Sequence, residues 1–249
     1  MVVVPWVIDL DGVVWLGDQP VEGAAAAVGR LRRAGEEVAF VTNNASAAAI
    51  DVSARLAAMD IDAEGRVVTS AEAAATLLNP GSRVMVRGTD AARQTMEGAG
   101  GVVVDEGPVD VVVVGWHQDF TYGSLAAAHQ AIVGGARFIA TNDDSTYPLA
   151  GRTLPGNGAI VAFLERSTGV RAEVAGKPHR PMAELLRARF GETGWVVGDR
   201  PETDGLMARQ LGWRFGLVLS GITTEAEAVD PRPDAVGTDL ADLVAQVLA

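Results

Sequence analysis

Short hydrophobic runs alternate along this chain with longer stretches that carry apolar residues at helical spacing. The first run covers residues 6–8, the Ala-rich stretch 20–34 follows with Val28 and Leu31 at helical spacing, and the second run covers residues 38–41. Short continuous runs are typical of buried strands, and strands that alternate with helices predict a parallel sheet. The first part of the chain is therefore predicted to form an open α/β sheet with right-handed crossovers.

The turn-forming sequence Asn79-Pro80-Gly81 interrupts this pattern and marks a candidate domain boundary. A second alternating series follows it, with hydrophobic runs at residues 84–86, 111–114 and 138–140. The first series then resumes, with runs at residues 195–197 and 215–219. We therefore predict a discontinuous core, residues 1–79 and 173–249, that carries an inserted α/β domain over residues 80–172.

Composition narrows the classes of function that such a fold could serve. Hydrophobic residues make up 48% of the 249-residue chain and charged residues 21%, as expected for a globular protein, and cysteine is absent. Disulfides, a thiolate nucleophile and a zinc–thiolate site are thereby excluded. The sequence shows no signal-peptide pattern and no run of about 20 apolar residues, so we expect no membrane span and a cytoplasmic location.

The formal net charge of −12 argues against nucleic acid and anionic membranes as partners. The same charge repels a phosphorylated small molecule at long range. A phosphate site in this chain must therefore be positive locally, through a metal ion, a lysine or a helix N-terminus.

Four polar motifs lie at the ends of predicted strands or soon after them. They are Asp9-Leu10-Asp11-Gly12, Thr42-Asn43-Asn44, Gly176-Lys177-Pro178 and the segment from Gly198-Asp199-Arg200 to Asp204. The carboxyl ends of parallel strands meet at one edge of an open sheet, and ligands bind at that edge. In an extended chain Asp9 and Asp11 point to the same side, and their hard oxygen atoms favour Mg²⁺. One carboxylate can attack phosphorus while the other protonates the leaving oxygen, so the pattern predicts phosphoryl transfer.

Each motif taken alone also has a simpler structural explanation. Asp-x-Asp-Gly suits a strand-to-turn junction, and Thr42-Asn43-Asn44 suits a polar loop that caps the next helix. Most lysines are solvated surface groups, and Asp204 could cap a helix. The combination of the motifs is more specific than its parts.

Together the motifs resemble those of the haloacid dehalogenase superfamily of phosphohydrolases, and within it the branch of 4-nitrophenylphosphatase-like and NagD-like enzymes. The resemblance covers essentially the whole chain, and the segment 119–142 is similar to the inserted cap of that branch. It implies a Rossmann-like parallel-sheet core with an α/β cap of the C2 type. It also implies a Mg²⁺-dependent phosphatase that hydrolyses small phosphomonoesters through an aspartyl-phosphate intermediate.

The resemblance further implies a role for each carboxylate. Asp9 would be the nucleophile, and Asp11 would act first as general acid and then as general base. Mg²⁺ would be held by Asp9, Asp199 and the backbone carbonyl of Asp11. Asp204 would act indirectly, by orienting metal-bound water or Lys177.

The remaining motif residues would bind the phosphate. Thr42, Asn43 and Lys177 are implied to hold it in the ground state and in the transition state. An ammonium group and a metal ion neutralise charge on the transferring phosphoryl group, which is the largest usual contribution to this chemistry.

Some features leave the substrate open. Trp116-His117-Gln118 departs from the acidic and basic residues expected at this point of the cap, so leaving-group preference is not determined. His117, His129 and His179 lack metal-ligand spacing and are interpreted as surface or packing residues. Relatives often dimerise through the cap, but no feature of this sequence establishes a homodimer.

Three alternatives stay open on the sequence. A phosphotransferase or a phosphonatase would use the same aspartate, although a phosphonatase would place a Schiff-base lysine in the insert, where residues 80–172 contain none. A non-catalytic phosphometabolite-binding protein would keep the scaffold, although no motif residue is missing. A dinucleotide-binding protein would carry Gly-x-Gly-x-x-Gly after the first strand, where Asp9-Leu10-Asp11-Gly12 stands instead.

Overall fold

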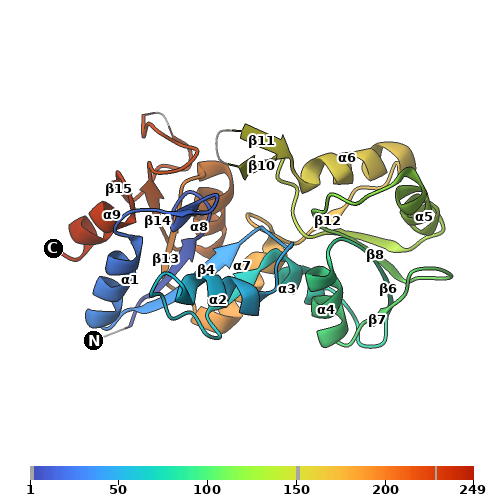
Figure 1. Cartoon of the computed structure of the whole chain (residues 1–249), viewed down its shortest axis with the longest axis horizontal. Helices are drawn as coiled ribbons and strands as arrows, with labels where there is room; N and C mark the ends of the chain where they lie inside the picture. Colours follow the sequence, from blue (N-terminus) through green and yellow to red (C-terminus); the bar gives the residue numbers. More distant parts are fainter. Residues whose placement is uncertain (1–2, 150–151, 228) are drawn as a thin grey trace. The chain divides into compact units, whose positions relative to one another are not determined.

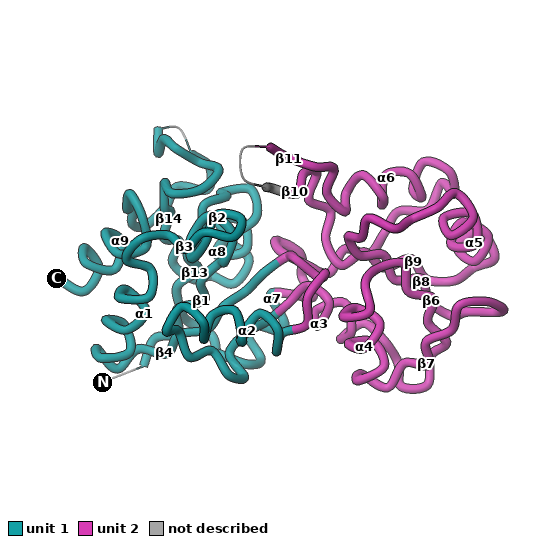
Figure 2. The backbone as a smooth tube through the Cα atoms, in the orientation of Figure 1, with its two compact units in different colours: residues 1–42, 49–68, 183–249 teal, residues 43–48, 69–182 magenta. Residues whose placement is uncertain are grey.

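The computed structural model describes residues 3–149, 152–227 and 229–249 (Figure 1). The chain divides into two compact units, each built around its own sheet (Figure 2). Unit 1 comprises residues 1–42, 49–68 and 183–249, and unit 2 comprises residues 43–48 and 69–182. Over the described part of the chain, none of the helices combines the length and apolar character that crossing a bilayer requires.

Unit 1 contains a six-stranded sheet in the order β15-β14-β13-β1-β4-β5. Its strands are β1 (Pro5–Asp9), β4 (Glu37–Thr42), β5 (Val67–Thr69), β13 (Trp195–Gly198), β14 (Arg214–Val218) and β15 (Ala235–Gly237). Its helices are α1 (Ala24–Arg33), α2 (Ala49–Ala57), α7 (Arg180–Phe190, which begins in unit 2), a π-helical turn (Pro201–Gly205), α8 (Leu206–Leu211) and α9 (Leu240–Val247). A short antiparallel hairpin joins β2 (Trp15–Leu16) to β3 (Gln19–Pro20).

The central strand β1 is buried along its whole length, as its continuous apolar run predicts. It pairs in parallel with β4 and β13, so that Ile8 lies opposite both Phe40 and Val197. At the start of β1, Trp6 stacks on Trp195 of β13 with ring centroids 5.1 Å apart. This shared register brings the carboxyl ends of the three strands to the same edge of the sheet, where the polar motifs begin.

Unit 2 contains a second parallel sheet, in the order β12-β9-β8-β6-β7. Its strands are β6 (Arg83–Arg87), β7 (Val102–Val103), β8 (Val111–Val114), β9 (Arg137–Ala140) and β12 (Glu173–Val174). Its helices are α3 (Ser70–Ala75), α4 (Asp90–Gly98), α5 (Tyr122–Val133) and α6 (Asn157–Thr168), and an antiparallel hairpin joins β10 (Thr146–Leu149) to β11 (Arg152–Pro155).

The core of unit 2 forms where α5 and α6 pack on one face of its sheet, and Figure 1 shows α4 on the other. Val112 and Val114 of β8 contribute to this core together with Leu125 of α5 and Leu164 of α6. All four residues of β8 are buried. The predicted α/β fold, with a parallel-sheet core and an inserted α/β domain, is confirmed.

The compact units group some residues differently from the predicted domains. Residues 43–48, 69–79 and 173–182 pack with unit 2. The functional boundaries, a core of residues 1–79 and 173–249 with a cap over residues 80–172, stay a prediction.

Candidate active site

A cluster of three carboxylates lies at the carboxyl edge of the unit 1 sheet. One oxygen atom from each of Asp9, Asp199 and Asp204 lies within 4.8 Å of the other two. The side chains are almost fully enclosed, with exposed fractions of 7%, 1% and 0%. Two predicted metal ligands, Asp9 and Asp199, thus lie together, and Asp204 joins them.

The local fold explains how these three side chains meet. Asp9 ends β1, and Asp199 directly follows the neighbouring strand β13. The π-helical turn that comes next returns the chain toward the sheet, and the backbone N–H of Arg200 donates to the Asp204 carboxylate at 3.2 Å. A Cβ atom on Gly198 would overlap the Asp204 side chain, so this position admits only glycine.

A loop after β14 holds Asp199 in place. The backbone N–H of Ile222 donates to the Asp199 carboxylate at 2.6 Å, and the Ser220 hydroxyl donates to the carbonyl of Gly12 at 2.7 Å. Gly12 has a φ of +87°, and a Cβ atom there would overlap Asp199. Ser220 and Ile222 were not among the predicted site residues, although Ser220 directly follows the predicted strand at residues 215–219.

Asp11 lies outside the carboxylate cluster and has its own partner. The indole N–H of Trp15 donates to Asp11 Oδ1 at 3.0 Å. Asp11 is half-buried, in contrast to Asp9. The two carboxylates of the first motif therefore occupy different surroundings, as two different chemical roles require.

The cluster has the donor chemistry of a site for a hard divalent cation. Two ionised oxygen atoms within 4.8 Å repel by at least about 3.5 kcal/mol at an effective dielectric constant of about 20. Burial adds a desolvation penalty for each carboxylate. A bound Mg²⁺ would offset both costs, and oxygen ligands are the ones that it prefers.

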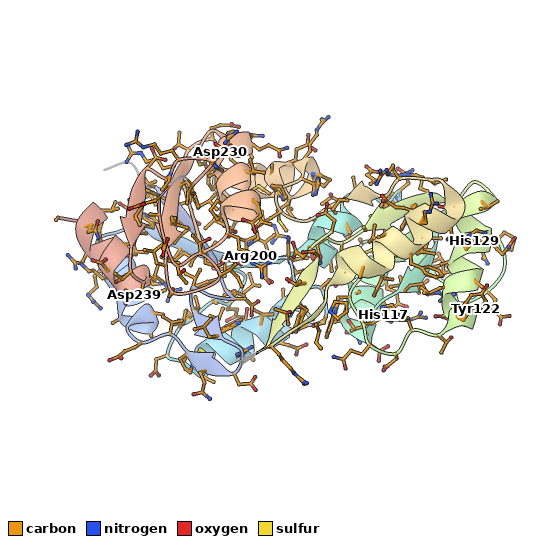
Figure 3. All side chains as sticks on the ribbon, turned by 90° about the horizontal axis from the view of Figure 1, so that it is seen from above. His117, Tyr122, His129, Arg200, Asp230 and Asp239 are labelled. Carbon is orange, nitrogen blue, oxygen red and sulfur yellow. The ribbon has the colours of Figure 1, made fainter. Side chains whose placement is uncertain are left out.

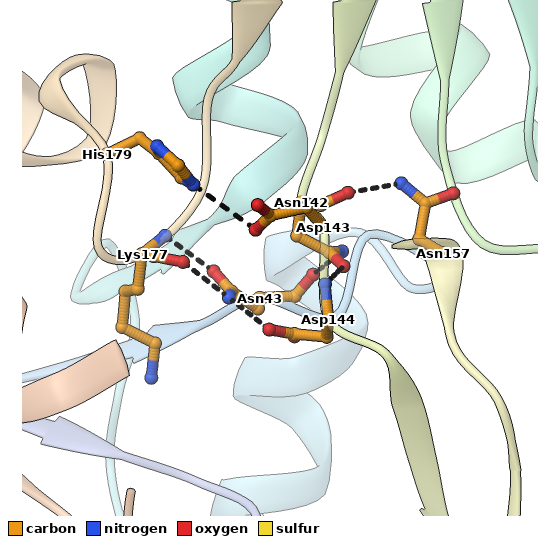
Figure 4. A network of polar contacts seen from close by, with 7 residues as sticks. All are labelled: Asn43, Asn142, Asp143, Asp144, Asn157, Lys177 and His179. Carbon is orange, nitrogen blue, oxygen red and sulfur yellow. Dashed lines mark hydrogen bonds and ion pairs between the residues drawn. The ribbon is translucent and has the colours of Figure 1, made fainter. Parts of the chain in front are cut away.

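Lys177 and Asn43 form a second cluster, within unit 2. Lys177 is the only lysine in the chain, and its side chain is 2% exposed. The Asn43 side chain binds both sides of the Lys177 backbone: its Oδ1 accepts from the Lys177 N–H at 2.7 Å, and its Nδ2 donates to the Lys177 carbonyl at 2.9 Å (Figure 4). A chain with 20 cationic residues thus keeps its single ammonium group at a buried position.

The glycine of this motif is required for a steric reason. A Cβ atom on Gly176 would lie 2.5 Å from Asn43 Oδ1 and 2.6 Å from the carbonyl oxygen of Thr141. The N–H of Gly176 donates to that same carbonyl at 2.7 Å. Gly176 therefore lets the chain come close enough for Lys177 to bond with Asn43.

Thr42 is the last residue of unit 1 before the chain passes into unit 2. It is the last residue of β4, is 3% exposed, and directly precedes Asn43. The predicted site residues other than Asp204, which lies in the π-helical turn, are placed at a strand end or in a loop that follows one. The grouping of Asp9, Asp199 and Asp204 lies within unit 1, and that of Asn43 and Lys177 lies within unit 2.

Each of the three histidines contacts a neighbouring polar group, and none belongs to the carboxylate cluster found among the described residues. His117 and His129, both labelled in Figure 3, contact the carbonyl of Gly115 at 2.8 Å and the hydroxyl of Ser167 at 3.0 Å, respectively. His179 lies 3.2 Å from a carboxylate oxygen of Asp143. These contacts agree with their interpretation as surface or packing residues.

Known proteins match the chain over nearly all of its length. A sequence model of the family described as haloacid dehalogenase-like hydrolase matches residues 6–101, and a second model, HAD-hydrolase-like, matches residues 174–243. The D-glycerol 3-phosphate phosphatase of Mycobacterium tuberculosis is 40% identical over 95% of this chain and 69% of its own. The chain belongs to the haloacid dehalogenase-like hydrolase family.

Other members of the family agree with the predicted branch. The acid sugar phosphatase of Staphylococcus haemolyticus is 34% identical over 94% of this chain and 93% of its own. The p-nitrophenyl phosphatase of Archaeoglobus fulgidus superposes with a TM-score of 0.90 at 27% identity, over 97% of this chain and 98% of its own. The glycerol phosphate phosphatase of M. tuberculosis, solved in complex with magnesium, superposes with a TM-score of 0.88 at 37% identity, over 96% of this chain and 75% of its own. The predicted family and enzyme class, a phosphoric monoester hydrolase, are confirmed.

Proposed function

We propose that the chain is a Mg²⁺-dependent phosphatase for small phosphomonoesters, with Asp9 as its nucleophile. The observation that carries this proposal is the buried cluster of Asp9, Asp199 and Asp204, whose oxygen atoms lie within 4.8 Å of one another. Such a cluster is costly without a cation. Asp9, one of its members, ends the first strand of the sheet, and relatives of this chain are named phosphatases.

In the first half of the reaction, a carboxylate oxygen of Asp9 attacks phosphorus and the bond to the leaving oxygen breaks. Asp11 donates its proton to that oxygen, so the alcohol leaves neutral. The indole N–H of Trp15, which donates to Asp11, holds the acid in one orientation. The product of this half is an aspartyl phosphate on Asp9.

In the second half, Asp11 takes a proton from water while the water oxygen attacks the phosphorus. The bond from phosphorus to Asp9 breaks, inorganic phosphate forms, and the Asp9 carboxylate is restored. Asp11 then carries a proton for the next cycle, so acid and base duties alternate on one residue.

Mg²⁺ held by Asp9, Asp199 and the backbone carbonyl of Asp11 would supply positive charge that neutralises the phosphoryl oxygens. Asp204 accepts from the backbone N–H of Arg200, and we propose that it orients the surrounding groups rather than acting on phosphorus. Thr42, with its hydroxyl, and Lys177, with its ammonium group, would bind the phosphoryl oxygens.

Asn43 would bind phosphate through its backbone N–H rather than its side chain. Both N–H bonds of the side-chain amide are already used, because they donate to the Lys177 carbonyl at 2.9 Å and to Asp144 at 3.2 Å. The phosphate-binding role predicted for Asn43 is therefore proposed for its main chain alone.

The substrates proposed are monophosphates of small polyols and sugars. Support comes from the relatives, which are named D-glycerol 3-phosphate phosphatase and acid sugar phosphatase. We propose that residues 80–172 act as the cap that selects the leaving group. A net charge of −12 supports the absence of a nucleic-acid partner, and a cytoplasmic location and homodimer formation remain part of the proposal.

Phosphate release tests the proposal directly. Wild type and Asp9→Asn are assayed with 4-nitrophenyl phosphate, glycerol 3-phosphate and a panel of sugar phosphates, in Mg²⁺ and in EDTA. We expect turnover by wild type in Mg²⁺ only, and none by Asp9→Asn. A variant that keeps more than about a tenth of wild-type activity, a loss below about 1.4 kcal/mol, would refute Asp9 as nucleophile.

A further inference from the structure

The insert supplies a carboxylate that contacts the amide of Asn43. Asn43 Nδ2 donates to Asp144 Oδ1 at 3.2 Å, across 101 residues of sequence. The same nitrogen donates to the Lys177 carbonyl at 2.9 Å, while Asn43 Oδ1 accepts from the Lys177 N–H at 2.7 Å (Figure 4). Three contacts thus fix one amide group, and two of them are to the backbone of the motif lysine.

Asp144 favours the same orientation of the Asn43 amide as the Lys177 backbone does. An ionised carboxylate only accepts hydrogen bonds, so it selects the orientation in which the amide nitrogen faces Asp144. In that orientation the amide oxygen faces the Lys177 N–H. The flipped amide would place its oxygen against two acceptors and its nitrogen against a donor. Asp144 and the Lys177 backbone therefore require the same orientation.

The loop that carries Asp144 is itself held to Asn43 by a second contact. Asn142, which is 4% exposed, donates from its side chain to the backbone carbonyl of Asn43 at 2.7 Å, and its Oδ1 accepts from the Asp144 N–H at 3.2 Å. Asn157 at the start of α6 donates to the Asn142 carbonyl at 2.7 Å. The loop after β9 thus binds both the backbone and the side chain of Asn43.

We propose that Asp144 is a positioning residue for the phosphatase reaction. It acts through the Asn43 amide, which holds the backbone of Lys177 and so sets where the Lys177 ammonium can reach. This inference rests on the proposed function, because it assigns Asp144 a part in the same reaction. The cap would then support catalysis through the contact of Asp144 with Asn43.

The single lysine makes the contact directly measurable. Protein labelled with ¹⁵N-lysine gives one backbone amide signal, that of Lys177, because the sequence contains no other lysine. Its hydrogen-exchange rate reports the bond from the Lys177 N–H to Asn43 Oδ1. We expect slow exchange in wild type, the fastest exchange in Asn43→Ala, and exchange about tenfold faster than wild type in Asp144→Ala, since a weakened hydrogen bond opens more often.

Asp105→Ala is the matched control. It removes the same charge from the insert, but Asp105 pairs with Arg93 on the surface and its side chain is 72% exposed. We expect its Lys177 signal and its activity to match wild type. Asp144→Ala exchange at the control rate would overturn the inference, whatever the activity.

Kinetics test the consequence for the reaction. We expect kcat/KM to fall about a hundredfold in Asn43→Ala and about tenfold in Asp144→Ala, chiefly through kcat, because displaced catalytic groups lose transition-state stabilisation. A purely structural role would lower Tm and leave kcat of the folded protein unchanged. Wild-type kcat in Asp144→Ala would therefore refute positioning.

An exchange of the two side chains tests the pair itself. Asn43→Asp alone places a carboxylate against Asp144 and is expected to be less active than Asn43→Ala. Adding Asp144→Asn restores a donor facing the carboxylate at position 43, although that carboxylate still faces the Lys177 carbonyl. The double variant should therefore have a kcat about tenfold above that of Asn43→Asp and below that of wild type. No recovery would overturn the direct link between positions 43 and 144.

Failure of the proposed function and failure of the positioning role of Asp144 give different results. If wild type hydrolyses no phosphomonoester in the panel, the proposed function fails, and the catalytic role of Asp144 fails with it. The Lys177 exchange rates would still decide whether Asp144 orders the Lys177 backbone. If wild type is active and Asp144→Ala matches the Asp105→Ala control in Lys177 exchange and in kcat, the positioning role fails and the proposed function stands.

Discussion

Magnesium should raise the thermal stability of the chain, and Asp9→Asn should remove most of that rise. Asp9 takes part in two of the three pairwise repulsions within the carboxylate cluster, whose oxygen atoms lie within 4.8 Å. Each repulsion amounts to at least about 3.5 kcal/mol at an effective dielectric constant of about 20. The substitution therefore replaces an anionic metal ligand with a neutral amide oxygen, and it removes the larger part of the electrostatic cost that the metal offsets.

The expected size of the effect follows from binding linkage. Free Mg²⁺ at about 100 times its Kd stabilises the native state by about 2.7 kcal/mol. For a domain of this size, about 1 kcal/mol corresponds to a Tm shift of about 2–4 °C. Wild type should therefore melt about 5–11 °C higher in saturating Mg²⁺ than in EDTA, and Asp9→Asn should show less than half of that shift.

Differential scanning calorimetry in EDTA and in a Mg²⁺ series measures both shifts. Asp11→Asn is the control with the same charge change, because the Asp11 carboxylate lies outside the cluster and bonds to Trp15 instead. It should lose phosphatase activity and keep the full Mg²⁺ shift. Equal Mg²⁺ shifts in wild type and Asp9→Asn would refute the assignment of the cluster as the metal site.

Three further changes test other parts of the structure. The His179 ring donates to Asp143 and so lowers the pKa of that carboxyl below 3.8. Asp143→Asn should therefore reduce the free energy of unfolding by about 0.2–1 kcal/mol near pH 6, as is usual for exposed pairs. Urea unfolding should show this difference vanishing as pH falls below 3.8. Trp116 stacks on Tyr147 with ring centroids 4.1 Å apart, so Trp116→Ala should change the ratio of kcat/KM between 4-nitrophenyl phosphate and glycerol 3-phosphate; an unchanged ratio would exclude the pair from leaving-group selection. Gly176→Ala should destabilise the fold by about 1–3 kcal/mol in urea melts, because its Cβ meets oxygen atoms at 2.5 and 2.6 Å; wild-type stability would contradict the steric argument.

The sign of the Asp143 effect follows from linkage. A carboxyl whose pKa is lowered in the folded state binds protons less readily there than in the unfolded chain. Its contribution to stability is present above the ordinary pKa of 3.8 and is lost as pH falls through the folded-state value. Wild type and Asp143→Asn should therefore become equally stable only at a pH below 3.8.

Local sequence signals predicted the strands and the motif residues at their ends. The runs at residues 6–8 and 111–114 lie within β1 and β8, because a strand that is buried on both faces carries no polar positions. Asp9, Thr42 and Asp199 are found at strand ends for the same reason: the hydrophobic run stops where the sheet stops. The hairpins β2–β3 and β10–β11 were not predicted, because strands of two to four residues carry too little alternation to detect.

The sequence by itself determined which residues are available for chemistry: the paired aspartates, the single lysine and the glycines beside them. Only the tertiary structure decided which of them meet. Asp204 joins Asp9 because a π-helical turn returns it to the sheet edge. Asp144 reaches Asn43 across 101 residues because the segment that follows β9 contacts Asn43. A hydrogen bond between distant segments leaves no periodic pattern in either of them, so its partners become visible only once the sheets have brought them together.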